Sequence, residues 1–283
     1  AANVAIGCAA LVTNTTGCCN VAIGCETLGA NTTANFITAV GARALQTNTT
    51  GAGNTGLGYV ALRANTTGAS NTATGYNALG VNTTGYSNIA VGFCALDTNT
   101  TGNRNVAVGE GTLEKQTTGV FNTGIGNRAL CNITTGCNNI GIGVDAGTDE
   151  LGSITTGENQ IVLGNHNHQN AFIKIDWTVT SDLRDKTEIK NVTHGLDFVN
   201  QITPIEYRFK KSRENDTPTG NKKYGFKAQE ILELEGDNPI IVNNDDTDNL
   251  KLTSAHLIPV LVNAIKELKA RIEVLENEWS KSK

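Results

Sequence analysis

Residues 1–164 repeat one short pattern of apolar and polar positions. Each copy ends in a glycine, and the three residues before it carry a large, a small and a large side chain, as in Val4-Ala5-Ile6. Alternation with a period of two is typical of a short strand whose large and small side chains point to opposite faces. The anchoring glycines follow one another in steps of 17 residues: Gly7, Gly24, Gly41, Gly58, Gly75, Gly92, Gly109, Gly126 and Gly143.

Other positions follow the same period. A leucine stands four residues after most of these glycines, an asparagine stands four residues before eight of the nine, and a Thr-Thr-Gly turn recurs between copies. Such a turn tolerates positive φ. We therefore predict one strand–turn–strand–turn circuit per repeat, stacked into a parallel β-solenoid or β-roll over residues 1–164. At about 4.8 Å per rung the repeats form a rod of roughly 43 Å, and 17 residues with two turns leave no room for a pair of helices.

The small residue at the middle of each strand indicates close approach by another surface, which we interpret as a neighbouring chain. The segments resemble the Asn-x-Ala-Ile-Gly repeats of trimeric adhesin head domains, although the asparagine here lies one place closer to the glycine. That resemblance implies a homotrimer.

Residues 254–280 have a different apolar period. Large apolar residues recur there in alternating steps of three and four, which is the seam of a coiled coil. Ser254 is the expected N-cap, and Pro259 either lies in the first turn or kinks the helix. A packed core helix is the alternative, but the length and the charged outer face favour a coiled coil. The seam residues are Ile258, Leu261, Ile265, Leu268, Ile272, Leu275 and Trp279.

Composition divides the chain after Thr180. The formal net charge is −5 and 17% of the residues are charged. Residues 1–180 contain 15 charged residues, all seven cysteines and 27 of the 31 glycines, whereas residues 181–283 contain 34 charged residues and all four prolines. Such a break marks a domain boundary. The absence of methionine predicts an internal or C-terminal piece of a longer protein.

Charge and hydropathy also exclude some classes of partner. The acidic balance argues against a nucleic acid, because binding phosphate requires a basic face. No apolar run approaches the roughly 18 residues of a membrane span, so we expect no membrane insertion.

The repeat half offers few candidates for chemistry. An odd number of cysteines at small or apolar repeat positions favours buried free thiols in a reducing cell over disulfides. His166 and His168 form a His-x-His pair that suits an octahedral metal site in a trimer, but we favour a polar loop. Glu110 and Glu114 are the nearest pair of carboxylates for carbohydrate cleavage, and we interpret them as surface residues. We expect no metal and no cofactor.

The second half begins with a motif that carries chemistry. Ser181-Asp182-x-Arg184-x-Lys186 follows a strand-like segment at 172–177. These residues resemble the signature of the intramolecular chaperone domain, the self-cleaving C-terminal domain of phage tail spikes and fibres. The resemblance continues in order through the segments 195–199, 204–207, 225–231 and 264–268, and so extends over about 100 residues.

This resemblance implies a Ser–Lys dyad that cuts the chain between Thr180 and Ser181. By position, Ser181 is the nucleophile and Lys186 the general base. Asp182 and Arg184 are the supporting residues of the motif. The family also implies three chains, whereas isoleucine at one seam position with leucine at the other favours two; we give the resemblance more weight.

The chemistry sets a condition on the charges near the dyad. A serine hydroxyl needs a base to remove its proton, and a lysine serves as that base only when its amine is neutral. Burial lowers the pKa of a lysine and nearby carboxylates raise it. Asp182 and Asp185 therefore oppose the role of Lys186 unless they point away. Pairing with Arg184 would also satisfy the condition. We expect a dyad that is silent in the monomer and becomes active when trimer assembly buries the lysine.

Together these features predict a component of a viral tail fibre or tail spike, located in the virion and assembled in the host cytoplasm. The predicted fold class is β followed by α+β: a solenoid at 1–164, a connecting strand at 165–180, and an α-rich chaperone and autoprotease at 181–283 with a coiled coil at 254–280. The expected partners are further copies of the chain, as a homotrimer, and a host surface glycan or protein receptor. The alternatives are a cell-surface trimeric adhesin with the same self-cleaving domain and a polysaccharide depolymerase with its active site elsewhere.

Overall fold

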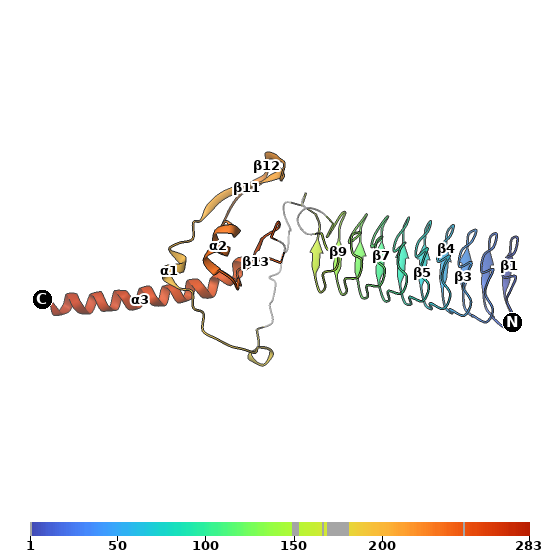
Figure 1. The fold of residues 1–283 in the computed structure, drawn as a ribbon, viewed down its shortest axis with the longest axis horizontal. Helices are drawn as coiled ribbons and strands as arrows, with labels where there is room; N and C mark the ends of the chain where they lie inside the picture. The colour runs from blue at the N-terminus through green and yellow to red at the C-terminus, as the bar shows by residue number, and fades with distance from the viewer. Residues whose placement is uncertain (1, 149–152, 166, 169–180, 246) are drawn as a thin grey trace. The chain divides into compact units, whose positions relative to one another are not determined.

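The computed structural model describes residues 2–148, 153–165, 167–168, 181–245 and 247–283 (Figure 1). The chain divides into two compact units, residues 1–168 and 169–283. The strand-like segment expected at 172–177 lies outside the described residues. None of the helices in the described ranges has the length and apolarity that crossing a membrane requires.

The first unit is a parallel β-solenoid, as predicted. Strand pairing follows the repeat, so that Val4 pairs with Val21 and Ile89 pairs with Val106. Figure 1 shows the rungs side by side in the order of the sequence. The strands are β1 (Val4–Ile6), β2 (Val21–Ile23), β3 (Thr38–Val40), β4 (Thr55–Leu57), β5 (Thr72–Thr74), β6 (Ile89–Val91), β7 (Val106–Val108), β8 (Thr123–Ile125), β9 (Ile140–Ile142) and β10 (Ile161–Leu163).

Each coil contains one strand in the described residues, where we predicted two. The rest of the coil is a series of turns in which several non-glycine residues adopt a left-handed backbone, among them Leu79 with φ of 51°. The N–H of Leu79 still donates to the carbonyl oxygen of Ala95 in the next coil at 3.0 Å. Because hydrogen bonds between coils continue through the turns, the ladder does not need a second strand.

The small middle residue of each strand points into the coil, which corrects our assignment of that column to a neighbouring chain. Ala22 and Ala73 are fully buried in the core of the unit. At the equivalent Gly56, an added Cβ would lie 3.2 Å from Leu45 Cδ1. The leucines fill the interior to close packing, so only a small side chain fits opposite them. The large strand residues consequently face outward.

Two ladders of buried asparagines run along the interior. In the first, the N–H of Asn71 donates to Asn54 Oδ1 at 2.8 Å, and Asn71 Nδ2 donates to the carbonyl of Gly85 at 2.8 Å. In the second, formed by the asparagines of the Asn-Thr-Thr-Gly turns, Asn65 Nδ2 donates to Asn48 Oδ1 at 2.7 Å. Buried polar groups require partners, and the repeat supplies these partners at successive rungs.

The cysteines correct a second expectation. All seven are free, but only Cys131 is buried. The others occupy turn positions that face outward, because a small or apolar residue at a given repeat position does not by itself place that position in the interior. The exposed thiols are Cys8, Cys19 and Cys25, and the half-buried ones are Cys18, Cys94 and Cys137.

The second unit is a small mixed α/β structure with a long helix near its end (Figure 1). Its central feature is an antiparallel hairpin of β11 and β12, which the sequence analysis did not predict. The elements are the 3-10 turn η1 (Leu183–Asp185), α1 (Leu196–Val199), β11 (Ile205–Ser212), β12 (Asn215–Gly225), α2 (Ala228–Glu235), β13 (Val242–Asn243), β14 (Lys251–Leu252), the 3-10 turn η2 (Ser254–His256) and α3 (Leu257–Lys281).

A small core joins segments that are far apart in the chain. Phe198 of α1 and Ile231 of α2 are buried in one cluster with Val260 of α3. The N–H of Leu196 donates to Glu267 Oε2 at 2.8 Å, which anchors α1 on α3. A Cβ added to the preceding Gly195 would overlap the Glu267 carboxylate, so a larger residue there would displace this side chain from its hydrogen bond with Leu196.

Helix α3 contains the predicted apolar seam. Pro259 lies in its first turn, as one of our two alternatives expected. Ser254 is not its N-cap: it lies in η2, and α3 begins after His256, whose side chain makes no capping hydrogen bond. Val260 and Ala264 are buried, whereas all seven predicted seam residues are exposed. The described residues of one chain therefore leave the seam uncovered.

Candidate active site

Ser181 and Lys186 meet at the start of the described part of the second unit. Lys186 Nζ donates to Ser181 Oγ at 2.8 Å. The turn η1 brings them together, because the N–H of Lys186 donates to the carbonyl of Leu183 at 3.2 Å and so folds the chain back. The structure thus places the two residues of the expected dyad within hydrogen-bonding distance, and their catalytic roles remain a prediction.

Asp182 holds this turn in shape. It is the N-cap of η1, where its Oδ1 accepts a hydrogen bond from the N–H of Arg184 at 2.9 Å. The same carboxylate forms a two-pronged ion pair with the Arg184 guanidinium, with Nη2–Oδ2 at 2.6 Å and Nε–Oδ1 at 3.1 Å. Pairing with Arg184, one of the two alternatives considered for the nearby carboxylates, is therefore present at Asp182.

The ion pair shifts the titration of both groups. The side-chain hydrogen bond from Arg184, followed by the backbone hydrogen bond, lowers the pKa of Asp182 below its usual value. Asp182 in turn raises the pKa of Arg184 above its usual value. Both groups are charged at neutral pH, and the aspartate charge is balanced by the guanidinium beside it.

The candidate site is open to solvent in a single chain. All residues from Ser181 to Lys190 are exposed. In general, a lysine amine becomes neutral near physiological pH when it is removed from water, and one chain provides no such cover here. One chain therefore brings Lys186 and Ser181 into contact but buries neither of them.

Other predicted site residues fall outside what the structure describes. Thr180, which precedes the expected scissile bond, is one of these, and His166 is another. The neighbouring His168 is described, and its Nδ1 lies 3.0 Å from Asn165 Oδ1. Among described residues, no group of three or more His, Cys, Asp or Glu side chains is arranged to hold a metal ion. The His-x-His metal alternative is thus not tested.

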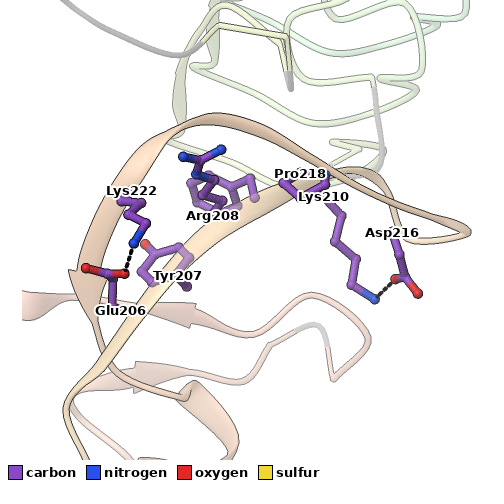
Figure 2. Close-up of a pocket in the computed structure, with 8 residues that line it drawn as sticks. Glu206, Tyr207, Arg208, Lys210, Asp216, Pro218 and Lys222 are labelled. Carbon is purple, nitrogen blue, oxygen red and sulfur yellow. Dashed lines mark ion pairs between the residues drawn. The ribbon is translucent and has the colours of Figure 1, made fainter.

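The hairpin carries an open hollow of about 600 Å³ (Figure 2). Figure 2 shows two ion pairs among its five charged lining residues: Lys222 with Glu206, at 2.6 Å between Nζ and Oε1, and Lys210 with Asp216. Arg208 is the fifth charged residue of the lining and takes part in neither pair. Neither residue of the dyad lines the hollow, and we assign no reaction to it.

The solenoid displays a row of aromatic side chains that sequence analysis did not single out. Tyr59, Tyr76 and Phe93 follow the anchoring glycine in three successive repeats, and their rings stack with centroids 5.7 and 5.1 Å apart. All three are about half exposed. Other repeats carry cysteine, alanine, glutamate, asparagine or valine at this position, so the scaffold does not require an aromatic there. The 17-residue step was the signal that identifies the row.

Polar groups adjoin this row. Asn77, which follows Tyr76, donates to Asp97 Oδ1 at 2.6 Å. Burial, and then the charge of Glu114, raises the pKa of Asp97. Glu110, the residue we paired with Glu114, accepts instead from Asn127 Nδ2 at 3.3 Å. The surface beside the aromatic rings therefore combines an amide with a partly desolvated carboxylate.

Comparison with known proteins gives one result. Residues 181–237 match the model of the peptidase S74 family, the chaperone of endosialidase, and this range includes Ser181 and Lys186. No curated protein and no solved structure is significantly similar to the chain. The match implies assembly as a homotrimer, and with the β-solenoid before it fits a tail fibre or tail spike that carries an intramolecular chaperone.

Proposed function

We propose that the chain is a component of a homotrimeric viral tail fibre or tail spike that cleaves itself between Thr180 and Ser181. Residues 181–283 align three chains during assembly and are then released, while the solenoid at 1–164 and the connector at 165–180 stay on the particle. The observation that carries the proposal is the 2.8 Å contact between Lys186 Nζ and Ser181 Oγ, at the first residues of the family match.

The reaction follows from the two side chains. Neutral Lys186 accepts the hydroxyl proton as Ser181 Oγ attacks the carbonyl carbon of Thr180. The Thr180 C–N bond breaks, the nitrogen of Ser181 takes up the proton, and an ester joins Thr180 to Ser181 Oγ. Water then hydrolyses the ester. The products are a carboxylate on Thr180 and a free amine and hydroxyl on Ser181.

Variants of the dyad test the cleavage. On a denaturing gel, the wild-type chain should yield a fragment whose N-terminal residue is Ser181. Ser181→Ala and Lys186→Ala should abolish that fragment, and Lys186→Arg should do so as well, because arginine stays protonated. Lys190→Ala, which removes a nearby exposed lysine, is the matched control and should cut normally. Uncut wild-type trimer under all conditions would refute the protease and leave the chaperone role standing.

The exposure of the dyad supports activation by assembly. Packing of three chains would exclude water from Lys186 and so favour its neutral amine. Ile265→Lys with Leu268→Lys charges the exposed seam of α3 and should prevent both trimer formation and cleavage. Lys266→Ala, at an exposed position away from the seam, should affect neither. A monomeric seam variant that cuts as fast as the wild-type trimer would refute activation by assembly.

The aromatic row supports a role for the solenoid in host attachment. Binding sites commonly combine aromatic side chains with a few polar groups, and Tyr59, Tyr76 and Phe93 lie beside Asn77 and Asp97 in this way. We expect the trimer to bind a host surface glycan there. Tyr59→Ala with Tyr76→Ala should abolish binding to host polysaccharide in a pull-down assay.

A control separates this row from exposed aromatics in general. Phe121 is half-exposed elsewhere on the coil, and Phe121→Ala should bind polysaccharide as the parent does. Equal binding by the tyrosine variant would exclude the row as the glycan site. Release of reducing ends during the incubation would indicate the depolymerase alternative.

A further inference from the structure

The large side chains of β1–β10 form an outward apolar face along the coil. They lie on both sides of the buried middle residue. The exposed fraction of the exposed ones ranges from 36% at Val91 to 67% at Ile161. Threonine fills the remaining positions, and none of the ten strands contains a charged residue. The face thus continues without a charge over the whole ladder.

This face is comparable to the largest apolar patch on a typical monomer. Ten rungs at about 4.8 Å extend over roughly 43 Å, and two columns of side chains about 7 Å apart give an area on the order of 300 Å². Contiguous apolar surfaces of this size mark interaction sites. An interface between macromolecules is the expected use of the face.

Charged residues occur elsewhere on the same coil. Arg43 Nε pairs with Glu26 Oε2 at 3.0 Å, and Arg128 Nε pairs with Asp145 Oδ1 at 3.3 Å, in both cases between turn positions of successive coils. The absence of charge is therefore a property of the strand face and not of the whole solenoid. The face offers no opposite charge to a strongly charged partner, and its threonine hydroxyls are the only side-chain hydrogen-bonding groups that a sugar could contact.

A second copy of the solenoid has the chemistry that fits this face. It presents the same apolar columns at the same rung spacing, so aliphatic side chains of two copies interdigitate along the full ladder. The second unit of the chain carries its own uncovered apolar seam on α3. Two uncovered apolar surfaces on one chain, together with the family match that implies a homotrimer, point to the same partner.

We propose that the outward strand face of β1–β10 is where three copies of the solenoid pack around a common axis. The inference rests on the proposed homotrimer and deepens it: the shaft has an interface of its own and stays trimeric after residues 181–283 are released. In a closed threefold ring each face meets two neighbours. The buried alanine column, to which sequence analysis assigned this contact, takes no part in it.

Site-specific photo-cross-linking in the full chain tests the interface. Benzoylphenylalanine replaces Ile125 on the strand face in one variant and the exposed Thr118 in another. Light scattering first establishes the mass of each. The Ile125 variant should give covalent dimers and trimers on a denaturing gel, and the Thr118 variant should give monomer. A trimer without cross-links from Ile125 overturns the interface alone, whereas a monomer overturns both the interface and the homotrimer.

A pair of charge variants gives a second test. Val91→Asp with Ile125→Asp charges the strand face, and Thr101→Asp with Thr118→Asp adds the same charge at exposed threonines. Circular dichroism shows whether each retains the fold of the parent. The strand-face variant should lose resistance to dissociation in detergent, and the threonine variant should keep it. Equal resistance in two folded variants would overturn the inference.

Discussion

The solenoid and the second unit are each stabilised internally by a different kind of contact. In the solenoid the partner of a side chain lies one repeat away, as when Asn82 Nδ2 donates to Asn65 Oδ1 at 2.8 Å. In the second unit the partners are distant in the chain, as with the bond between Leu196 and Glu267. The solenoid buries a continuous interior and leaves one strand face apolar and exposed, whereas the second unit buries a small cluster and leaves a whole helix seam exposed. The repeats thus bury a continuous apolar core within one chain, whereas the second unit buries a smaller one and leaves its helix seam exposed.

Replacing an anchoring glycine should damage the solenoid most. Gly75 has φ of +133°, and a Cβ there would overlap the carbonyl oxygen of Gly92 in the next coil. We expect Gly75→Ala to lower the free energy of unfolding by about 4 kcal/mol or more. Thermal unfolding followed by circular dichroism measures the loss.

Gly236 is the matched control in the second unit. It has φ of +71°, but no atom lies within 4 Å of an added Cβ. Gly236→Ala should therefore cost only the strain of the backbone at φ of 71° and ψ of −139°, about 1–3 kcal/mol. Equal losses in the two variants would contradict the idea that contact between coils requires the anchoring glycines.

Truncating a core residue of the second unit should destabilise that unit and leave the stability of the solenoid unchanged. Ile231 is fully buried in the small core, and Ile231→Ala should cost about 2–5 kcal/mol there. Hydrogen exchange should show lost protection in α2 and unchanged protection in β1–β10. Lost protection in both units would show that they unfold as one.

Each buried asparagine should contribute less to the free energy of unfolding than an anchoring glycine does. Asn82→Ala removes the donor to Asn65 Oδ1 and the acceptor of Asn99 Nδ2, whereas the carbonyl of Gly85 keeps the hydrogen bond from Asn71. The expected loss is about 1–3 kcal/mol in urea unfolding. Thr84→Ala, at an exposed position of the same turn, should change stability by less than about 0.5 kcal/mol. A silent Asn82→Ala would refute a structural role for the ladder.

The smallest expected effect concerns pH and the turn at the dyad. Arg184 lowers the pKa of Asp182 in the folded turn relative to the unfolded chain. The pair therefore favours the turn fully at pH above the unfolded value of about 3.9, and this contribution disappears as the pH falls through the lowered pKa. Carbon-13 titration of the carboxyl should show the low pKa in the parent and a return toward about 3.9 in Arg184→Gln. The same pKa in both would refute the ion pair.

The sequence was most informative where repetition alone determines geometry. The 17-residue step predicts in-register parallel rungs, because equivalent residues must stack. The period of two shows that large and small side chains occupy opposite faces, but not which face is inside. The interior volume decides that: Leu45 already fills the space opposite Gly56. The left-handed leucines were not predicted, because they arise from bonding between coils.

The second unit was less predictable from pattern. Strand β12 contains few apolar residues and carries the neighbouring charges Lys222-Lys223, so it lacks the alternation that identifies a strand. Strand β11 does alternate over residues 205–210, and we passed over that signal in the sequence. The pairing of Ser181 with Lys186 was suggested by a family resemblance and not by geometry. Their contact depends on a turn three residues long, for which no apolar period exists.

The constant step of the coil has one more consequence. Sliding one solenoid along another by 17 residues sets Val4 beside Val21, and nine of the ten rungs still face an uncharged rung. The aligned and the shifted pairings therefore differ by only about a tenth of the contact between them. Because the rungs are nearly equivalent, the strand faces alone do not determine which rung meets which. The alignment of three such faces must therefore come from a segment whose residues are not repeated. We expect the small core of the second unit, whose residues follow no repeat, to set that alignment.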